Sequence, residues 1–158
     1  MKQDNTAQHE NYCHVAEQLA VYLGNGQDIA MLSIGDVSFY SSYTYIAAEL
    51  VKMGLETKMC AGVPSFCAAA TELNISLSEG SEPLTIMPAQ HKDAREMLER
   101  DGTKVIMKSG KKLSDIKEML SDRETVFAAE NCGFPGQKLY RHIDEITDCG
   151  YFTVMIVK

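Results

Sequence analysis

The residue types that could act on a ligand lie in four short segments that each contain glycine and follow an apolar run. These segments are residues 34–42, 60–70, 105–112 and 128–136. Glycine permits close approach of a backbone to a ligand, and Asp36 offers a carboxylate directly after Gly35. The lysines at 108, 111 and 112 suit the carboxylates of an anionic substrate. The sequence contains no evident catalytic dyad.

Each segment also has a purely structural interpretation. Asp36 can cap the following helix while Gly35 makes the turn, and Pro64 can open a helix whose small residues pack tightly on a sheet. The lysine cluster can be a solvated turn, and residues 128–136 by themselves are ambiguous. Taken one at a time, the four segments leave both interpretations open.

The segments alternate with runs that predict strands and helices. Strands are expected at 28–34, 56–60, 84–87, 103–107 and 125–129, and helices at 11–23, 40–53, 64–73, 91–100 and 113–120. This alternation predicts an α/β fold with a mainly parallel sheet. Ligands bind such sheets beyond the carboxyl ends of the strands, where all four segments would lie. Residues 138–143 and 151–157 lack an intervening helix and predict an antiparallel pair at the sheet edge.

A stretch of small and polar residues at 77–83 predicts a linker. The chain is therefore expected to form two small α/β domains, residues 1–80 and residues 81–158, the second with a mixed sheet.

Composition excludes several classes of function. Fifteen basic and twenty-two acidic residues give a net charge of -7, which argues against nonspecific binding to nucleic acid. No apolar run is long enough to span a membrane and the start is polar, so a soluble, cytoplasmic protein without a membrane partner is expected. Five cysteines without a CxxC pair and four scattered histidines predict neither a disulfide frame nor a metal site.

Taken in order, the segments resemble the tetrapyrrole methylases, which methylate precorrins with S-adenosylmethionine. The resemblance rests on Gly35-Asp36 before Phe39-Tyr40-Ser41, on Gly62 to Phe66 before an alanine run, on 77–80 before 84–88, and on 106–108. The most similar subgroup comprises the precorrin-2 or cobalt-factor II C(20)-methyltransferases of cobalamin biosynthesis. The resemblance implies two α/β domains around a trough, an S-adenosylmethionine cofactor, a precorrin or cobalt-precorrin substrate and a homodimer.

The chain departs from the family pattern at three places. The family's opening strand and Gly-x-Gly-Pro-Gly-Asp loop have no counterpart before the helix near Asn11, so the first domain is expected to be incomplete. Val37 and Ala61 stand where prolines are usual. These two differences affect loop stiffness more than chemistry.

The resemblance also implies roles for individual residues. Cofactor contacts fall on Gly35, Asp36, Phe39, Pro64, Ser65, Met107, Lys108 and Cys132. Substrate contacts are expected at Tyr40 and Ser41, and also at Lys111 and Arg141 because precorrin-2 is a polycarboxylate that basic groups would bind. No metal ligand and no catalytic residue is assigned. Two alternatives stay open: a methylase of the same superfamily with another substrate, and a noncatalytic α/β module that binds a partner.

Overall fold

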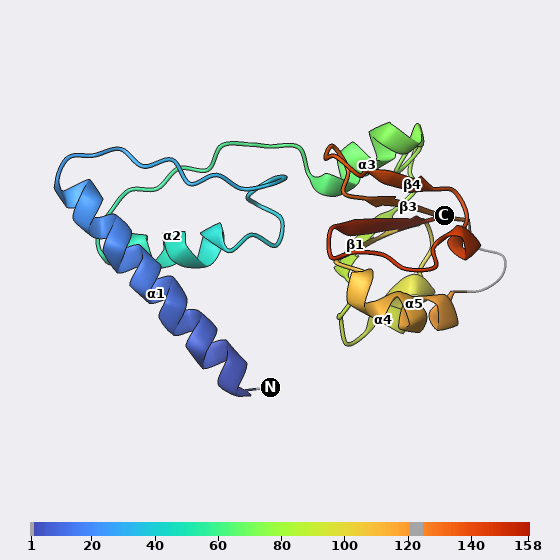
Figure 1. Ribbon diagram of the computed structural model, residues 1–158, viewed down its shortest axis with the longest axis horizontal. Coiled ribbons are helices and arrows are strands. Elements are labelled where there is room, and N and C mark those ends of the chain that lie inside the picture. Colours follow the sequence, from blue (N-terminus) through green and yellow to red (C-terminus); the bar gives the residue numbers. More distant parts are fainter. Residues whose placement is uncertain (1, 121–124) are drawn as a thin grey trace. The chain divides into compact units, whose positions relative to one another are not determined.

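The computed structural model describes residues 2–120 and 125–158, with side chains described from residue 6 onward except at position 111. The chain forms two compact units, residues 1–64 and residues 65–158, called unit 1 and unit 2 (Figure 1). Within the described residues, no helix is long and apolar enough to cross a bilayer. The predicted division into two domains at residue 80 stays a prediction.

Unit 1 is built on two helices, α1 (Lys2–Gly24) and α2 (Tyr43–Lys52). Their contact buries Ala16, Ile46 and Leu50, and the predicted helix at 11–23 is confirmed. Helix α1 begins earlier than expected because no glycine or proline interrupts residues 2–23. Helix α2 begins at Tyr43 rather than Tyr40, since Tyr40 has a left-handed φ of 49° that a right-handed helix cannot contain.

The strands predicted at 28–34 and 56–60 are absent from the structure. Among the described residues, neither segment has a backbone hydrogen bond to a neighbouring strand. Their apolar side chains lie largely in solvent, with Leu32 91% and Ile34 69% exposed. Both predictions were wrong because apolar composition favours a strand only where a second strand supplies the ladder.

Unit 2 contains one five-stranded mixed sheet in the order β1-β2-β5-β3-β4. Its strands are β1 (Leu84–Pro88), β2 (Thr103–Met107), β3 (Val126–Glu130), β4 (Lys138–Tyr140) and β5 (Thr153–Val157). The α/β class and the mixed sheet are confirmed. The sheet is not mainly parallel, because only the β1–β2 pairing is parallel and the other three are antiparallel.

The predicted edge pair of β4 and β5 was wrong. Strand β5 lies between β2 and β3, whereas β4 pairs with β3 at the edge. All five residues of β5 are buried, which is the pattern of a strand covered on both faces. By contrast, β4 has only partly buried and exposed residues.

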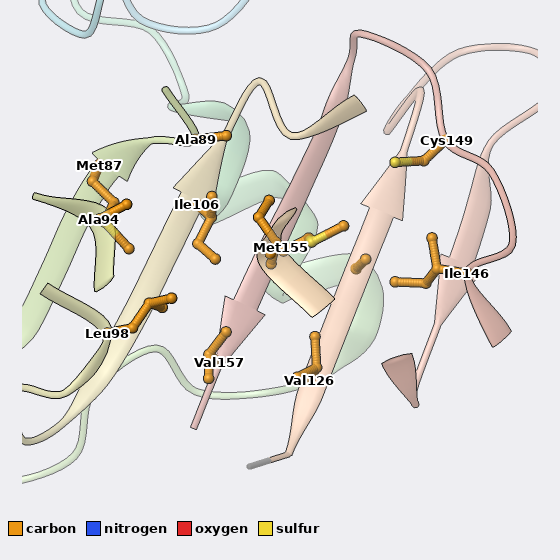
Figure 2. Close-up of a cluster of buried hydrophobic side chains, with 12 residues drawn as sticks. Met87, Ala89, Ala94, Leu98, Ile106, Val126, Ile146, Cys149, Met155 and Val157 are labelled. Carbon is orange, nitrogen blue, oxygen red and sulfur yellow. The ribbon is translucent and has the colours of Figure 1, made fainter. Parts of the chain in front are cut away.

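Helices cover both faces of this sheet (Figure 1). On one face α3 (Ser65–Leu73) packs with Val105, Ala129 and Ile156. On the other, α4 (Ala94–Leu98) and α5 (Leu113–Met119) cover a cluster that includes Ile106 and Met155, whose side chains point to the same side of the sheet in Figure 2. The helix predicted at 91–100 is thus shorter than expected. Two 3-10 turns complete the unit, Gly110–Lys112 and Ile143–Glu145.

Candidate functional site

The Gly35-Asp36 turn of unit 1 is held by the Asp36 carboxylate. Its Oδ1 accepts hydrogen bonds from the hydroxyl and the backbone N–H of Ser38, and its Oδ2 accepts one of 2.8 Å from the backbone N–H of Gly62. The Ser38 hydroxyl, then the Ser38 N–H and the Gly62 N–H, lower the pKa of Asp36. Asp36 is therefore an ionised residue that joins two turns, and it does not cap α2.

The first and second predicted segments come together at Gly62. A Cβ atom built on Gly62 would lie 2.2 Å from the carbonyl oxygen of Gly35, so no side chain fits there without displacing the turn. Gly35 itself has a left-handed φ of 93°. Only glycines permit this approach of the two backbones.

The residues after Asp36 are exposed and organise the start of α2. Phe39 and Tyr40 are 38% and 49% exposed. The Ser41 Oγ accepts a hydrogen bond of 3.2 Å from the backbone N–H of Tyr43, and the Ser41 carbonyl accepts one from Thr44. Ser41 therefore supports the N-terminus of α2, and the half-exposed ring of Tyr40 is accessible to a ligand.

A separate cluster forms in unit 2 where β2 and β3 end. Strands β1, β2 and β3 run in the same direction, so Lys108 and Asn131, which follow β2 and β3, lie at the same end of the sheet. Both residues have left-handed φ angles, 60° and 51°. Such angles are costly for non-glycine residues and are concentrated at ligand-binding sites.

The loops that follow β2 and β3 are both hydrogen-bonded to the segment at the start of β5. The buried Ser109 donates a hydrogen bond of 3.1 Å from its Oγ to the Thr153 carbonyl, and the Asn131 N–H donates one of 3.0 Å to the Phe152 carbonyl. A Cβ on Gly110 would lie 2.2 Å from the carbonyl oxygen of Gly150. The third and fourth predicted segments are therefore held together at the same end of the sheet by their contacts with the start of β5.

Glu130, the last residue of β3, is a buried carboxylate that the sequence did not single out. It accepts a hydrogen bond of 2.8 Å from the Gly150 N–H and one of 3.3 Å from the Tyr140 hydroxyl, and Lys138 Nζ lies 3.4 Å away. Burial raises the pKa of Glu130, but the Gly150 N–H and Lys138 outweigh that effect and the net pKa is lowered. Its place at the end of a strand was the available clue.

Cys132 lies half-buried one residue beyond Asn131. Burial, followed by the negative charge of Glu72, raises the pKa of this thiol. Cys132 is therefore a neutral thiol at neutral pH and a poor nucleophile.

Three other predicted cofactor residues are Met107, Pro64 and Ser65. Met107 is buried in the core with Val105, so only its backbone is available, and its carbonyl accepts a hydrogen bond from Ala89. Pro64 is the last residue of unit 1, and Ser65 is the first residue of unit 2 and of α3.

Two of the predicted substrate residues, Lys111 and Arg141, lie in different parts of unit 2. Arg141 follows β4, which is antiparallel to β3, so Arg141 lies toward the opposite end of the strands from Lys108. Its guanidinium donates a hydrogen bond of 3.0 Å to the carbonyl of Leu73 at the end of α3. Lys111 belongs to the turn Gly110–Lys112, but its side chain is outside the described part of the structure.

Unit 1 also contains a hollow of about 380 Å³ lined by Leu19, Leu23, Ile46, Leu50 and residues from 29–32 and 56–60. None of the predicted cofactor residues lines it. The walls are mainly apolar, and Val37, the residue after Asp36, is one of them, so this hollow adjoins the Asp36 turn.

Sequence reasoning also missed a group of potential metal ligands in unit 1. His9, Cys13 and Glu49 each place a ligand atom within 4.8 Å of the others. The four-residue spacing of His9 and Cys13 on a helix was the available clue, whereas Glu49 comes from a different helix.

Comparisons with known proteins agree on one family. The family model for tetrapyrrole (corrin/porphyrin) methylases matches residues 1–146. A relative from Methanocaldococcus jannaschii, described as a probable cobalt-precorrin-2 C(20)-methyltransferase, is 32% identical over 140 residues, covering 83% of this chain and 59% of the relative. The chain therefore spans about three-fifths of the length of that relative.

Solved structures share the fold. A cobalt precorrin-4 methyltransferase superposes with a TM-score of 0.79 at 14% identity, covering 90% of this chain and 68% of the other. The uroporphyrin-III C-methyltransferase of Thermus thermophilus, solved with S-adenosyl homocysteine, gives 0.74 at 16% identity, covering 91% and 71%. With the family match over most of the chain, these observations place the protein in the tetrapyrrole methylase family.

Proposed function

We propose that this chain forms the methyl-transferring part of an S-adenosylmethionine-dependent enzyme that methylates C-20 of precorrin-2 or cobalt-factor II. The main support is the bond between Asp36 and Gly62, which joins two of the segments expected to contact the cofactor. The similarity to the M. jannaschii relative supports the C(20) assignment. That the T. thermophilus structure contains S-adenosyl homocysteine supports the choice of cofactor.

The residues present fit such a cofactor in chemical terms. The Gly35 and Gly62 backbones are held in a fixed geometry by contacts that a Cβ would abolish. When bound, S-adenosylmethionine supplies a methyl group that its sulfonium charge already activates. The protein then needs mainly to orient the reactants and exclude water, which contributes on the order of 7–11 kcal/mol when reactants are well aligned.

Individual residues would perform these tasks. In unit 1, Gly35, Asp36 and Phe39 would orient the cofactor. In unit 2 the backbone at Met107 and Lys108 would do so, together with the neutral thiol of Cys132, which does not compete for the methyl group because its pKa is raised. Pro64 and Ser65 complete the proposed cofactor set.

The substrate would be recognised by other groups. Precorrin-2 is a polycarboxylate, so Lys111 would pair with its carboxylates while Tyr40 and Ser41 contact the ring. Arg141 would first have to leave its hydrogen bond to Leu73.

The decisive assay incubates the purified chain with S-adenosylmethionine and precorrin-2, with and without inserted cobalt. The expected result is addition of one methyl group, located at C-20 by NMR, and formation of S-adenosylhomocysteine. Methylation at another ring position, or of another precorrin only, would identify a different methylase of the superfamily. A folded chain that binds cofactor but methylates no precorrin would contradict the proposal.

A second function, partner binding by unit 1, is favoured by its exposed apolar segments. Residues 28–34 and 56–60 are extended and have no ladder partner among the described residues, and Leu32 is 91% exposed. Unpaired extended segments of this kind favour association. We propose a second copy of the chain as the partner, forming a cytoplasmic homodimer, and light scattering that gives a monomer mass would exclude it.

A further inference from the structure

Helices α1 and α2 of unit 1 approach closely along one side. The rings of Tyr12 and Tyr45 stack with centroids 5.1 Å apart and an angle of 3° between planes. Four residues beyond Tyr12, Ala16 is fully buried, which allows the two backbones to come near each other. The residues beside this stacked pair are therefore held in a defined relation.

Three metal-ligating side chains gather beside the stacked rings. His9 and Cys13 come from successive turns of α1, and Glu49 comes from α2, one turn after Tyr45. Each offers one ligand atom, and these atoms lie within 4.8 Å of one another. Cys13 and Glu49 are half-buried and His9 is exposed, so an ion can reach the group from solvent.

The spacing of His9 and Cys13 matches that of two ligands on one tetrahedral ion. Residues four apart lie on the same face of a helix, and here the Cys13 Sγ is 3.8 Å from the His9 Nε2. Zn–S and Zn–N bonds of ordinary length at a tetrahedral angle place sulfur and nitrogen roughly 3.5 Å apart. A small rotation of either side chain closes that difference.

Glu49 can supply a third ligand without losing its present partner. Lys52 Nζ donates a hydrogen bond of 2.7 Å to Glu49 Oε1, so Oε2 remains for a metal. The Glu49 side chain is only 14% exposed, whereas that of Lys52 is 64% exposed. The lysine can therefore turn into solvent at little cost if the ion requires both oxygens.

We propose that His9, Cys13 and Glu49 form a Zn²⁺ site that fastens α1 to α2. A thiolate, an imidazole and a carboxylate together suit Zn²⁺, whereas Mg²⁺ and Ca²⁺ prefer oxygen ligands alone. Water would fill the fourth position, and binding would release the Cys13 thiol proton to solvent. Such a clamp stabilises a unit whose buried apolar cluster is small, comprising Ala16, Ile46 and Leu50 among the residues whose side chains are described.

The test uses Co²⁺ as a spectroscopic substitute for Zn²⁺, added to the full chain after chelator treatment. We expect binding of one ion with the visible bands of tetrahedral Co²⁺ and a near-ultraviolet thiolate-to-cobalt band, both abolished by one equivalent of Zn²⁺. C13S should lose the thiolate band, and H9Q and E49Q should weaken binding at least roughly tenfold. As matched controls, H14Q changes an exposed histidine on the same helix and C60S an exposed cysteine of the same unit.

A second measurement on the unmodified chain does not depend on the folding of any variant. Zn²⁺ should protect Cys13, but not the exposed Cys60, from alkylation followed by mass spectrometry, and should raise the thermal midpoint. The proposal is overturned if Cys13 alkylates equally fast with Zn²⁺, if the thiolate band is missing from the unmodified chain, or if it persists in C13S.

Discussion

The carboxylate of Asp36 and the backbone N–H of Gly62, 26 residues apart in sequence, are joined by a hydrogen bond of 2.8 Å. This bond brings together the two turns that the family resemblance assigns to the cofactor. Because the carboxylate also holds Ser38, a single side chain fixes the shape of both turns.

Replacing Asp36 tests this role. D36N keeps the shape of the side chain but removes its charge and one acceptor oxygen, so one of its N–H donors, on Ser38 or Gly62, loses its partner. We expect S-adenosylhomocysteine affinity to fall about tenfold or more, since hydrogen bonds to charged groups contribute about 1.5–3 kcal/mol. Calorimetry measures the change. The control is D28N, an exposed aspartate in the same unit, and equal affinity of the two variants would contradict the role of Asp36.

A methyl group at Gly62 should displace the same turns. In G62A the new Cβ would collide with the Gly35 carbonyl, 2.2 Å away, so the turns must separate and cofactor affinity should fall by at least about tenfold. G24A is the matched control, because a Cβ at that position has no neighbour within 4 Å. If the two alanine variants bind cofactor equally well, the close approach has no functional role.

The lowered pKa of Glu130 predicts a pH-dependent stability. A carboxylate with a folded pKa below its unfolded value, about 4.3, stabilises the fold fully above that value, and the contribution is lost as pH falls through the folded pKa. Denaturant unfolding of E130Q should therefore show lower stability at neutral pH and a smaller loss on acidification. E118Q, at an exposed position on α5, is the control and should retain the original slope.

The core of unit 2 should be sensitive to truncation of β5. I156A removes a fully buried side chain from a strand enclosed by β2 and β3, and we expect it to cost about 2–5 kcal/mol in unfolding free energy. V21A, at a 64% exposed site on α1, should change it by less than about 0.5 kcal/mol. A comparable loss in both variants would contradict the central place of β5.

Local patterns predicted where the helices and all five strands of unit 2 fall along the chain, since apolar periodicity reports burial directly. The position of β5 was missed, although five consecutive strand-forming residues from Thr153 to Val157 are typical of a central strand. The runs at 28–34 and 56–60 were misassigned because a ladder depends on a partner strand, which local sequence does not reveal.

At the candidate site, too, local sequence identified individual residues but not their long-range contacts. Asp36 was identified from its place after an apolar run, but its bond to Gly62 joins residues too distant for any local pattern to reveal. Glu130 was missed because its partners Lys138 and Gly150 come from later segments. Arg141 was assigned to the substrate on charge alone, whereas strand direction places it toward the opposite end of the strands from Lys108.

The most direct measurement is calorimetric titration of the folded chain with S-adenosylhomocysteine. Saturable binding of one molecule per chain, strongly weakened in G62A and unchanged in G24A, is the predicted result. A chain that circular dichroism shows to be folded, yet gives no saturable heat of binding, would contradict the assignment of the Asp36 and Gly62 turns to a methyl-donor site.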